Sequence, residues 1–263
     1  MTFVEKFSRL VEIMAKLRAP DGCPWDREQT HQSLRSYLLE ETYEVLETID
    51  QEKYDELGKE LGDLLLQVIF HAQIASEASR FTIGDVIDEI SHKLVRRHPH
   101  VFGDLKVNSA AEQKILWEHL KKAEGKNSVI DGVPAALPAL QRAQRLQQKT
   151  GTIGFEWESI EQVLQKFQSE LIELEEARRS GDMKQIEDEF GDVLFALVNI
   201  GRWLNLNAED ALRHACEKFS RRFRFVEERV NASGENVNSM SMEKWEELWN
   251  EAKEKCDDLV FSL

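Results

Sequence analysis

Apolar side chains recur along this chain at intervals of three and four residues, the spacing of one face of an α-helix. The first such face runs from Phe3 to Leu17, and the turn-forming Pro-Asp-Gly at 20–22 ends it. The same rhythm returns at residues 34–49, 57–75 and 83–95. We find no run of alternating β-branched residues bounded by hairpin turns. The pattern therefore predicts an all-α protein.

The helical pattern is interrupted once, near the middle of the chain. Residues 125–138, GKNSVIDGVPAALP, gather several turn-formers and two of the five prolines. We interpret this run as a linker. The predicted organisation is an N-terminal helical domain at 1–124, the linker at 125–138 and a C-terminal helical domain at 139–263.

The two halves repeat one another. ELGD at 60–63 returns as EFGD at 189–192, an offset of 129 (189 − 60), and the glutamates at 41 and 44 return at 170 and 173 with the same offset. Five further pairs recur at similar offsets. At 125 (218 − 93), Lys93 and Arg97 return as Lys218 and Arg222; at 132 (249 − 117), Trp117, Lys121 and Trp25 return as Trp249, Lys253 and Trp157. The offset changes by only a few residues from one helix to the next, which indicates a duplicated fold with short insertions or deletions between the helices.

Each half places four carboxylates on two successive helices. Residues three apart on a helix share a face, and the short link at 50–53 predicts an antiparallel hairpin that brings both faces together. Crowded carboxylates repel one another unless protons or cations neutralise them, and an all-oxygen ligand set suits Mg²⁺ or Mn²⁺. The candidate metal ligands are Glu41, Glu44, Glu60 and Asp63 in the first half and Glu170, Glu173, Glu189 and Asp192 in the second.

A glycine lies inside each acidic motif. Gly62 and Gly191 each cost about 1 kcal/mol relative to alanine inside a helix. We interpret them as positions where a missing side chain lets another helix or a ligand approach. The alternative is that both motifs are solvated faces of a highly charged protein, but repetition at one offset argues against it.

Cationic and aromatic residues recur beside the carboxylates. Lys93 and Arg97, like Lys218 and Arg222, are four residues apart and share a helix face, where they can hold phosphates. Trp117 and Trp249 can stack on a nucleobase, with a half-buried core tryptophan as the alternative. A metal cluster, a cationic pair and an aromatic platform together indicate a nucleotide substrate.

Composition narrows the function further. The formal charge of −15 argues against nucleic-acid or membrane partners. Three widely spaced cysteines and short apolar runs favour a cytoplasmic protein without disulfides. The sequence contains no Walker A motif, Rossmann fingerprint or G-x-S-x-G elbow, which excludes the common α/β nucleotide folds and serine hydrolases.

These motifs resemble those of a known family. EE-x-x-E at 40–44 followed by E-x-x-D at 60–63 resembles the signature of the MazG nucleoside triphosphate pyrophosphohydrolases, within the all-α NTP pyrophosphatase superfamily. The resemblance covers nearly the whole chain and points to the two-domain bacterial members. It extends to GCPWD at 22–26, RRHPHVF at 96–102, PALQRAQ at 138–144 and EKFSRRF at 217–223.

The resemblance implies Mg²⁺-dependent hydrolysis of a broad range of nucleoside triphosphates to the monophosphate and pyrophosphate. It also implies a homodimer in which each domain forms a four-helix core with its counterpart. In the C-terminal copy, which the resemblance favours as the catalytic one, the nucleotide contacts map to Ser169, Lys218, Arg222, Trp249 and Lys253. The second-choice site is N-terminal, with Glu40, Glu41, Glu44, Glu60, Asp63, Lys93, Arg97, Trp117 and Lys121.

One difference from the family signature argues against the C-terminal copy as the catalytic one. The second copy reads Ser169-Glu170 where the first reads Glu40-Glu41, so the leading glutamate of the signature is missing there. An N-terminal copy that serves only in dimerisation is one alternative. Another is a ferritin-like di-iron protein, suggested by Glu-x-x-His at 28–31 and 89–92, although neither motif is repeated in the second half.

Overall fold

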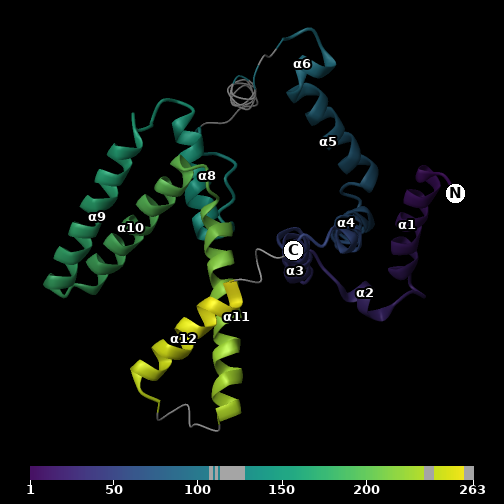
Figure 1. Cartoon of the computed structure of the whole chain (residues 1–263). Coiled ribbons are helices and arrows are strands. Elements are labelled where there is room, and N and C mark those ends of the chain that lie inside the picture. The colour runs from purple at the N-terminus through teal and green to yellow at the C-terminus, as the bar shows by residue number, and fades with distance from the viewer. Residues whose placement is uncertain (107–108, 110–111, 113–127, 234–239, 258–263) are drawn as a thin grey trace. The chain divides into compact units, whose positions relative to one another are not determined.

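The computed structural model describes residues 1–106, 109, 112, 128–233 and 240–257, and every regular element among them is a helix (Figure 1). This confirms the predicted all-α class. The chain forms two compact units, Met1–Ala110 and Ala111–Leu263, and each is described by itself. The domain limits at 124 and 139 stay a prediction.

The first unit is built around a helical hairpin. Its helices are α1 (Phe3–Leu17), α2 (Pro24–Glu28), α3 (Arg35–Asp50), α4 (Tyr54–Glu77), α5 (Ile83–Arg97) and α6 (Pro99–Phe102). Three residues join α3 to α4, so the two helices run antiparallel and pack together, as predicted. The apolar face of α1 packs on α4 through Met14 and Phe70, which are almost fully buried.

Local signals define the ends of α1. Thr2 and Glu5 form a capping box at its start, which satisfies two otherwise unpaired backbone N–H groups. After its end, Gly22 lies so close to the helix that an added Cβ would be 2.2 Å from the carbonyl oxygen of Leu17. Only glycine fits there, which explains why the Pro-Asp-Gly turn ends this helix.

The second unit contains two hairpins. Its helices are α8 (Ala139–Gly151), α9 (Ile160–Ser180), α10 (Met183–Trp203), α11 (Ala208–Ser233) and α12 (Met242–Asp257). Figure 1 shows α9 and α10 side by side, and α8 packs on α10 and α11. Gly181, with φ of 77°, ends α9, and the Asp182 side chain caps α10.

A buried lysine fastens the described part of the predicted linker. Lys149 on α8 is 6% exposed, and its Nζ donates to the carbonyl oxygens of Val129 (3.1 Å) and Asp131 (3.0 Å). Residues 129–131 are therefore held against α8.

Apolar side chains remain exposed on both hairpins. On α9 and α10, Ile172 is 61% exposed, Phe190 54% and Leu197 50%; on α3 and α4, Leu39 is 58% and Leu61 48%. Each unit therefore leaves an apolar surface uncovered around its hairpin. In the part of the chain that the structure describes, no helix is long and apolar enough to cross a membrane.

Candidate active site

The α3–α4 hairpin gathers carboxylates in the first unit. One oxygen from each of Glu41, Glu60 and Asp63 lies within 4.8 Å of the others. Glu60 is 7% exposed, and its Oε1 accepts a 3.0 Å contact from Lys59 Nζ. Burial, followed by the negative charges of Glu41 and Glu60, raises the pKa of Glu44, which lies outside this group of three.

The α9–α10 hairpin does the same in the second unit. Glu170, Glu173 and Glu189 each contribute an oxygen within 4.8 Å of the others. Burial, followed by the charges of Glu173 and Asp192, raises the pKa of Glu189. Asp192 thus lies close enough to act on the group electrostatically, although it is not one of the three.

A lysine ammonium contacts the second cluster. Lys166 Nζ lies 2.5 Å from Glu170 Oε1 and 3.9 Å from Glu173 Oε1. This hydrogen bond to Glu170 raises the pKa of Lys166, and the charges of Glu170 and Glu173 add to it. The lysine occupies the place that a cation takes among carboxylates.

The donor sets fit a hard divalent cation. Both groups offer only carboxylate oxygens, the ligands preferred by Mg²⁺ and Mn²⁺. In the first group, Glu60 Oε2 is buried and accepts no hydrogen bond among the described residues, which leaves an oxygen ready for a ligand.

Neither group contains a histidine, and His31 instead lies 2.8 Å from His71, Nδ1 to Nδ1. These groups therefore do not have the ligands of a ferritin-like di-iron centre.

The structure tests the interpretation of the two glycines within one chain. A Cβ built on Gly62 or Gly191 meets no described atom within 4 Å, so no other helix of the described chain approaches either position. Approach by a ligand or by a helix of a second copy stays a prediction.

The predicted nucleotide contacts of the second unit lie on two different hairpins. Ser169 is on α9, where its hydroxyl donates to the carbonyl oxygen of Lys166 (2.7 Å). Arg222 and Trp249 meet between α11 and α12, with the guanidinium carbon 5.9 Å from the ring centroid. Lys218 is exposed on α11, and Lys253 on α12 donates to Asn250 (3.1 Å). The structure thus brings Arg222 and Trp249 together, while α9 packs on α10 and α12 on α11.

The second-choice residues of the first unit are only partly described. Glu40 is exposed on α3, and Lys93 and Arg97 are half-buried on α5, which contacts α4. Trp117 and Lys121 lie outside the described residues. Whether this copy has a complete nucleotide site stays a prediction.

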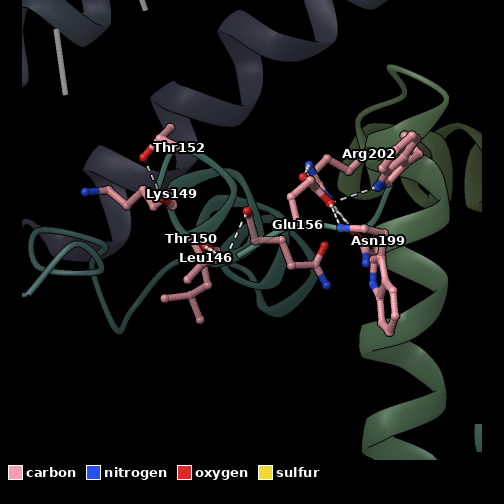
Figure 2. Close-up of polar contacts among 10 residues, drawn as sticks. Leu146, Lys149, Thr150, Thr152, Glu156, Asn199 and Arg202 are labelled. Atoms are coloured by element: carbon pink, nitrogen blue, oxygen red, sulfur yellow. Dashed lines mark hydrogen bonds and ion pairs between the residues drawn. The ribbon is translucent and has the colours of Figure 1, made fainter. Parts of the chain in front are cut away.

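Sequence reasoning missed an ion pair and a cavity beside the second cluster. Figure 2 shows Glu156, which follows α8, facing Arg202 and Asn199 on α10. Glu156 Oε2 lies 2.6 Å from Arg202 Nη1, and Glu156 Oε1 accepts from Arg202 Nη2 at 2.7 Å. Although burial opposes it, this bonding to Arg202 lowers the pKa of Glu156. The repeat pairs Trp157 with Trp25, which marked the tryptophan beside Glu156 but not Glu156 itself.

Comparisons with known proteins agree with the repeated motif. The family model of the MazG nucleotide pyrophosphohydrolase domain matches residues 29–102 and 158–226, which include both acidic hairpins. The nucleoside triphosphate pyrophosphohydrolase/pyrophosphatase MazG of Thermotoga maritima is 47% identical over 94% of this chain and 95% of its own length. The nucleoside triphosphate pyrophosphohydrolase of Escherichia coli K12 is 45% identical over 97% of this chain and all of its own. On this evidence, the chain belongs to the MazG family of nucleotide pyrophosphohydrolases.

Proposed function

We propose that the protein hydrolyses nucleoside triphosphates to the monophosphate and pyrophosphate with Mg²⁺, and that it accepts a broad range of bases. The observation that carries this proposal is the group of three carboxylates on α9 and α10, contacted by the Lys166 ammonium. Bound Mg²⁺ would neutralise phosphate charge and lower the pKa of the attacking water. The oxygen of that water would bond to a phosphorus atom of the P–O–P bridge between the α- and β-phosphates as the bridge breaks. The monophosphate and pyrophosphate would then leave, with the protons of the water passing to phosphate oxygens or to solvent.

The chain's own residues divide the work of positioning. Glu170, Glu173, Glu189 and Asp192 would hold the metal, and Lys218 and Arg222 would hold phosphate oxygens. Trp249 and Lys253 would contact the rest of the nucleotide, with Mn²⁺ as an alternative metal. We place the reaction in the cytoplasm, as the cysteine spacing predicts.

The same proposal includes a homodimer. A two-helix hairpin such as α9–α10 cannot bury both of its faces, and Ile172, Phe190 and Leu197 are at least half exposed. A second copy of the hairpin would complete a four-helix core. It could also bring α11 and α12 of one chain to the carboxylates of the other. Sedimentation of Phe190→Glu beside the wild type tests this, and an unchanged mass would contradict it.

The catalytic copy can be identified by matched substitutions. In separate full-length variants, Glu189→Gln and Glu60→Gln each remove one carboxylate, and Glu176→Gln changes an exposed glutamate of α9 as a control. Pyrophosphate release from mixed nucleoside triphosphates should fall at least about a hundredfold in Glu189→Gln, as for loss of a group that stabilises the transition state. A silent Glu60→Gln would make the first unit a dimerisation module. Full activity in both variants would disprove the carboxylate mechanism.

A further inference from the structure

Two histidines of the first unit face one another away from its carboxylate group. His31 lies in the turn between α2 and α3, and His71 lies on α4, eight residues beyond Asp63 (71 − 63). Their Nδ1 atoms are 2.8 Å apart. A ring carbon in either place would be well inside the van der Waals distance of about 3.5 Å, so nitrogens must occupy both positions.

The two imidazole rings meet edge to edge in one plane. Their planes differ by 9°, and their centroids are 5.1 Å apart, which exceeds the distance between the nitrogens by 2.3 Å (5.1 − 2.8). That difference is twice the distance from the centre of an imidazole ring to its own nitrogen. Both Nδ1 atoms therefore lie on the line between the centroids, and one donates its proton to the other. The two rings direct a ligand atom at the same point.

The turn that carries His31 is held in place by its own contacts. The backbone N–H of Thr30 donates to the hydroxyl of Ser33 at 2.9 Å, and that of Ser33 donates to the hydroxyl of Thr30 at 3.1 Å. Arg18, which pairs with Glu77 of α4, also donates to a backbone carbonyl of this turn at 3.2 Å. The pair of rings is thus pre-organised, which lowers the free-energy cost of binding a ligand.

The chemistry of the pair differs from that of the carboxylate groups. Burial, followed by the charge of His31, lowers the pKa of His71, which favours the neutral ring. Neutral imidazole nitrogen is a common ligand of Zn²⁺, Cu²⁺ and Ni²⁺, whereas Mg²⁺ prefers oxygen. The two nitrogens therefore suit a class of metal that the oxygen groups do not select.

A buried acceptor lies one helical turn before His71. Gln67 is 5% exposed, and its Oε1 has no hydrogen-bond partner among the described residues. Residues four apart on a helix share a face, so this amide lies on the side of α4 that carries His71. An unpaired buried acceptor costs free energy. A water molecule bound to a metal at His71 would supply a donor to it.

We propose that His31 and His71 bind a transition-metal cation of the Zn²⁺ and Cu²⁺ class through their two Nδ1 atoms. The proton between the rings leaves to solvent and another adds at Nε2 of the same ring, so both rings stay neutral. Water completes the coordination. At Zn–N distances of about 2.0–2.1 Å, the nitrogens of a tetrahedral site are roughly 3.3 Å apart, so the contact opens by only about half an ångström. The metal would fasten the turn before α3 to α4.

Copper paramagnetic resonance tests the ligands directly. One equivalent of Cu²⁺ is added to the full-length protein in excess Mg²⁺, which competes for the carboxylates. The wild-type spectrum should show splitting from two nitrogens, and His31→Phe and His71→Phe should each lose that pattern. His92→Phe, exposed on α5, is the matched control and should keep it. A wild-type spectrum of oxygen ligands alone, or a two-nitrogen pattern that persists in both variants, would overturn the proposal.

Zn²⁺ titration calorimetry measures the same site as an affinity. We expect the affinity to fall at least about tenfold in His31→Phe and in His71→Phe, because the second nitrogen of a two-point site binds at a high effective concentration. The control His92→Phe should match the wild type. Equal affinities in all four proteins would contradict the assignment.

Hydrogen exchange of the wild type keeps the inference testable if the variants fail to fold. Zn²⁺ at ten times its dissociation constant should slow exchange in peptides of the 29–34 turn about tenfold, since it stabilises only the closed state. Mg²⁺ at the same concentration should leave this turn unchanged. Exchange that Zn²⁺ does not slow, or that both ions slow equally, would refute the histidine site.

Discussion

The two acidic clusters come from one repeated pattern, yet each buries a different carboxylate. In the first unit the buried group is Glu60 on the second hairpin helix; in the second it is Glu170 on the first helix. Glu170 is the counterpart of Glu41, at the offset of 129 (170 − 41). The repeat therefore determines which hairpins gather carboxylates, while the packing around each hairpin determines which three of them meet and which one is buried.

The surroundings of the clusters differ more than the clusters themselves. The hollow beside Glu60 is lined by polar and charged side chains such as Glu47, Thr48 and Lys53. The cavity beside Glu170 has an aromatic border. At the position of Ala196 the first unit has Gln67 (196 − 67 = 129), which is buried and fills more volume. The two carboxylate groups thus adjoin surroundings of different chemistry, one polar and one bordered by aromatic rings.

Removal of the metal is the change with the largest expected effect. Without a divalent cation, the single ammonium of Lys166 faces several carboxylates of the second cluster, and the phosphates have no metal to bind. Treatment with a chelator should lower pyrophosphate release at least about a hundredfold, and added Mg²⁺ should restore it.

Mn²⁺ binding then separates the two clusters. Paramagnetic resonance should show two classes of site per chain, and Glu170→Gln should remove the class that supports activity while Glu41→Gln removes the other. Activity that survives chelation would contradict the metal mechanism for both units.

Each unit also contains a partly buried arginine–glutamate pair, and breaking it has the next largest effect. Arg18 pairs with Glu77 at 2.8 Å between α1 and α4, and Arg202 pairs with Glu156. Arg18→Met and Arg202→Met should each cost about 2 kcal/mol of local stability. Hydrogen exchange should rise in the peptides of the affected unit only. Arg145→Met, which loses one exposed contact with Gln148, is the control.

These pairs also predict a pH dependence. Hydrogen bonding to Arg18 lowers the pKa of Glu77, and that of Glu156 is lowered by Arg202 despite burial. A carboxylate whose pKa is lower in the folded protein stabilises the fold at pH values above its unfolded-state pKa of 4.5. That stabilisation is lost as the pH falls through the pKa of the folded state. Exchange differences between wild type and variants should be constant near neutrality and disappear in acid. Differences that grow in acid would contradict the assignment.

The sequence predicted the parts of this molecule that depend on local spacing. The helix at Phe3–Leu17 has the predicted limits, and α3, α4 and α5 begin and end within three residues of them, because their apolar faces follow the helical period. The gathering of glutamates on α9 and α10 followed from the same spacing. The short α2 and α6 were missed, since four or five residues carry too little periodicity.

Features that depend on long-range packing could not be predicted. Gln147 reaches the carbonyl of Phe195 across 48 positions, and Glu156 meets Arg202 across 46. No local pattern encodes such contacts, and glutamine at a helical position usually indicates a surface. The repeat was also a poor guide here, because the arginine of the pair directly follows α1 in the first unit but lies on α10 in the second.

A smaller effect distinguishes the two lysines. Lys166 contacts a glutamate that is 6% exposed, and Lys59 one that is 7% exposed. Lys166 Nζ also lies 3.9 Å from a second carboxylate, that of Glu173. Removing a competing ammonium should tighten Mn²⁺ binding. Because an ion pair of this kind contributes about 1 kcal/mol, we expect the Mn²⁺ affinity to rise about fivefold in Lys166→Met and less in Lys59→Met. Lys184→Met, exposed on α10, is the control, and weaker binding in Lys166→Met would contradict competition.

Ser169 has the smallest expected effect and bears most directly on which copy is catalytic. It replaces the leading glutamate of the signature, but its hydroxyl proton is donated to the Lys166 carbonyl one turn earlier. A hydroxyl bonded to its own helix contributes little to a neighbouring site, so Ser169→Ala should change kcat/KM less than about threefold, or 0.7 kcal/mol. Ser169→Glu should not increase it, because the second cluster already has its buried carboxylate. A tenfold gain in Ser169→Glu would show that the missing glutamate limits this copy, and would favour the first unit as the better-equipped one.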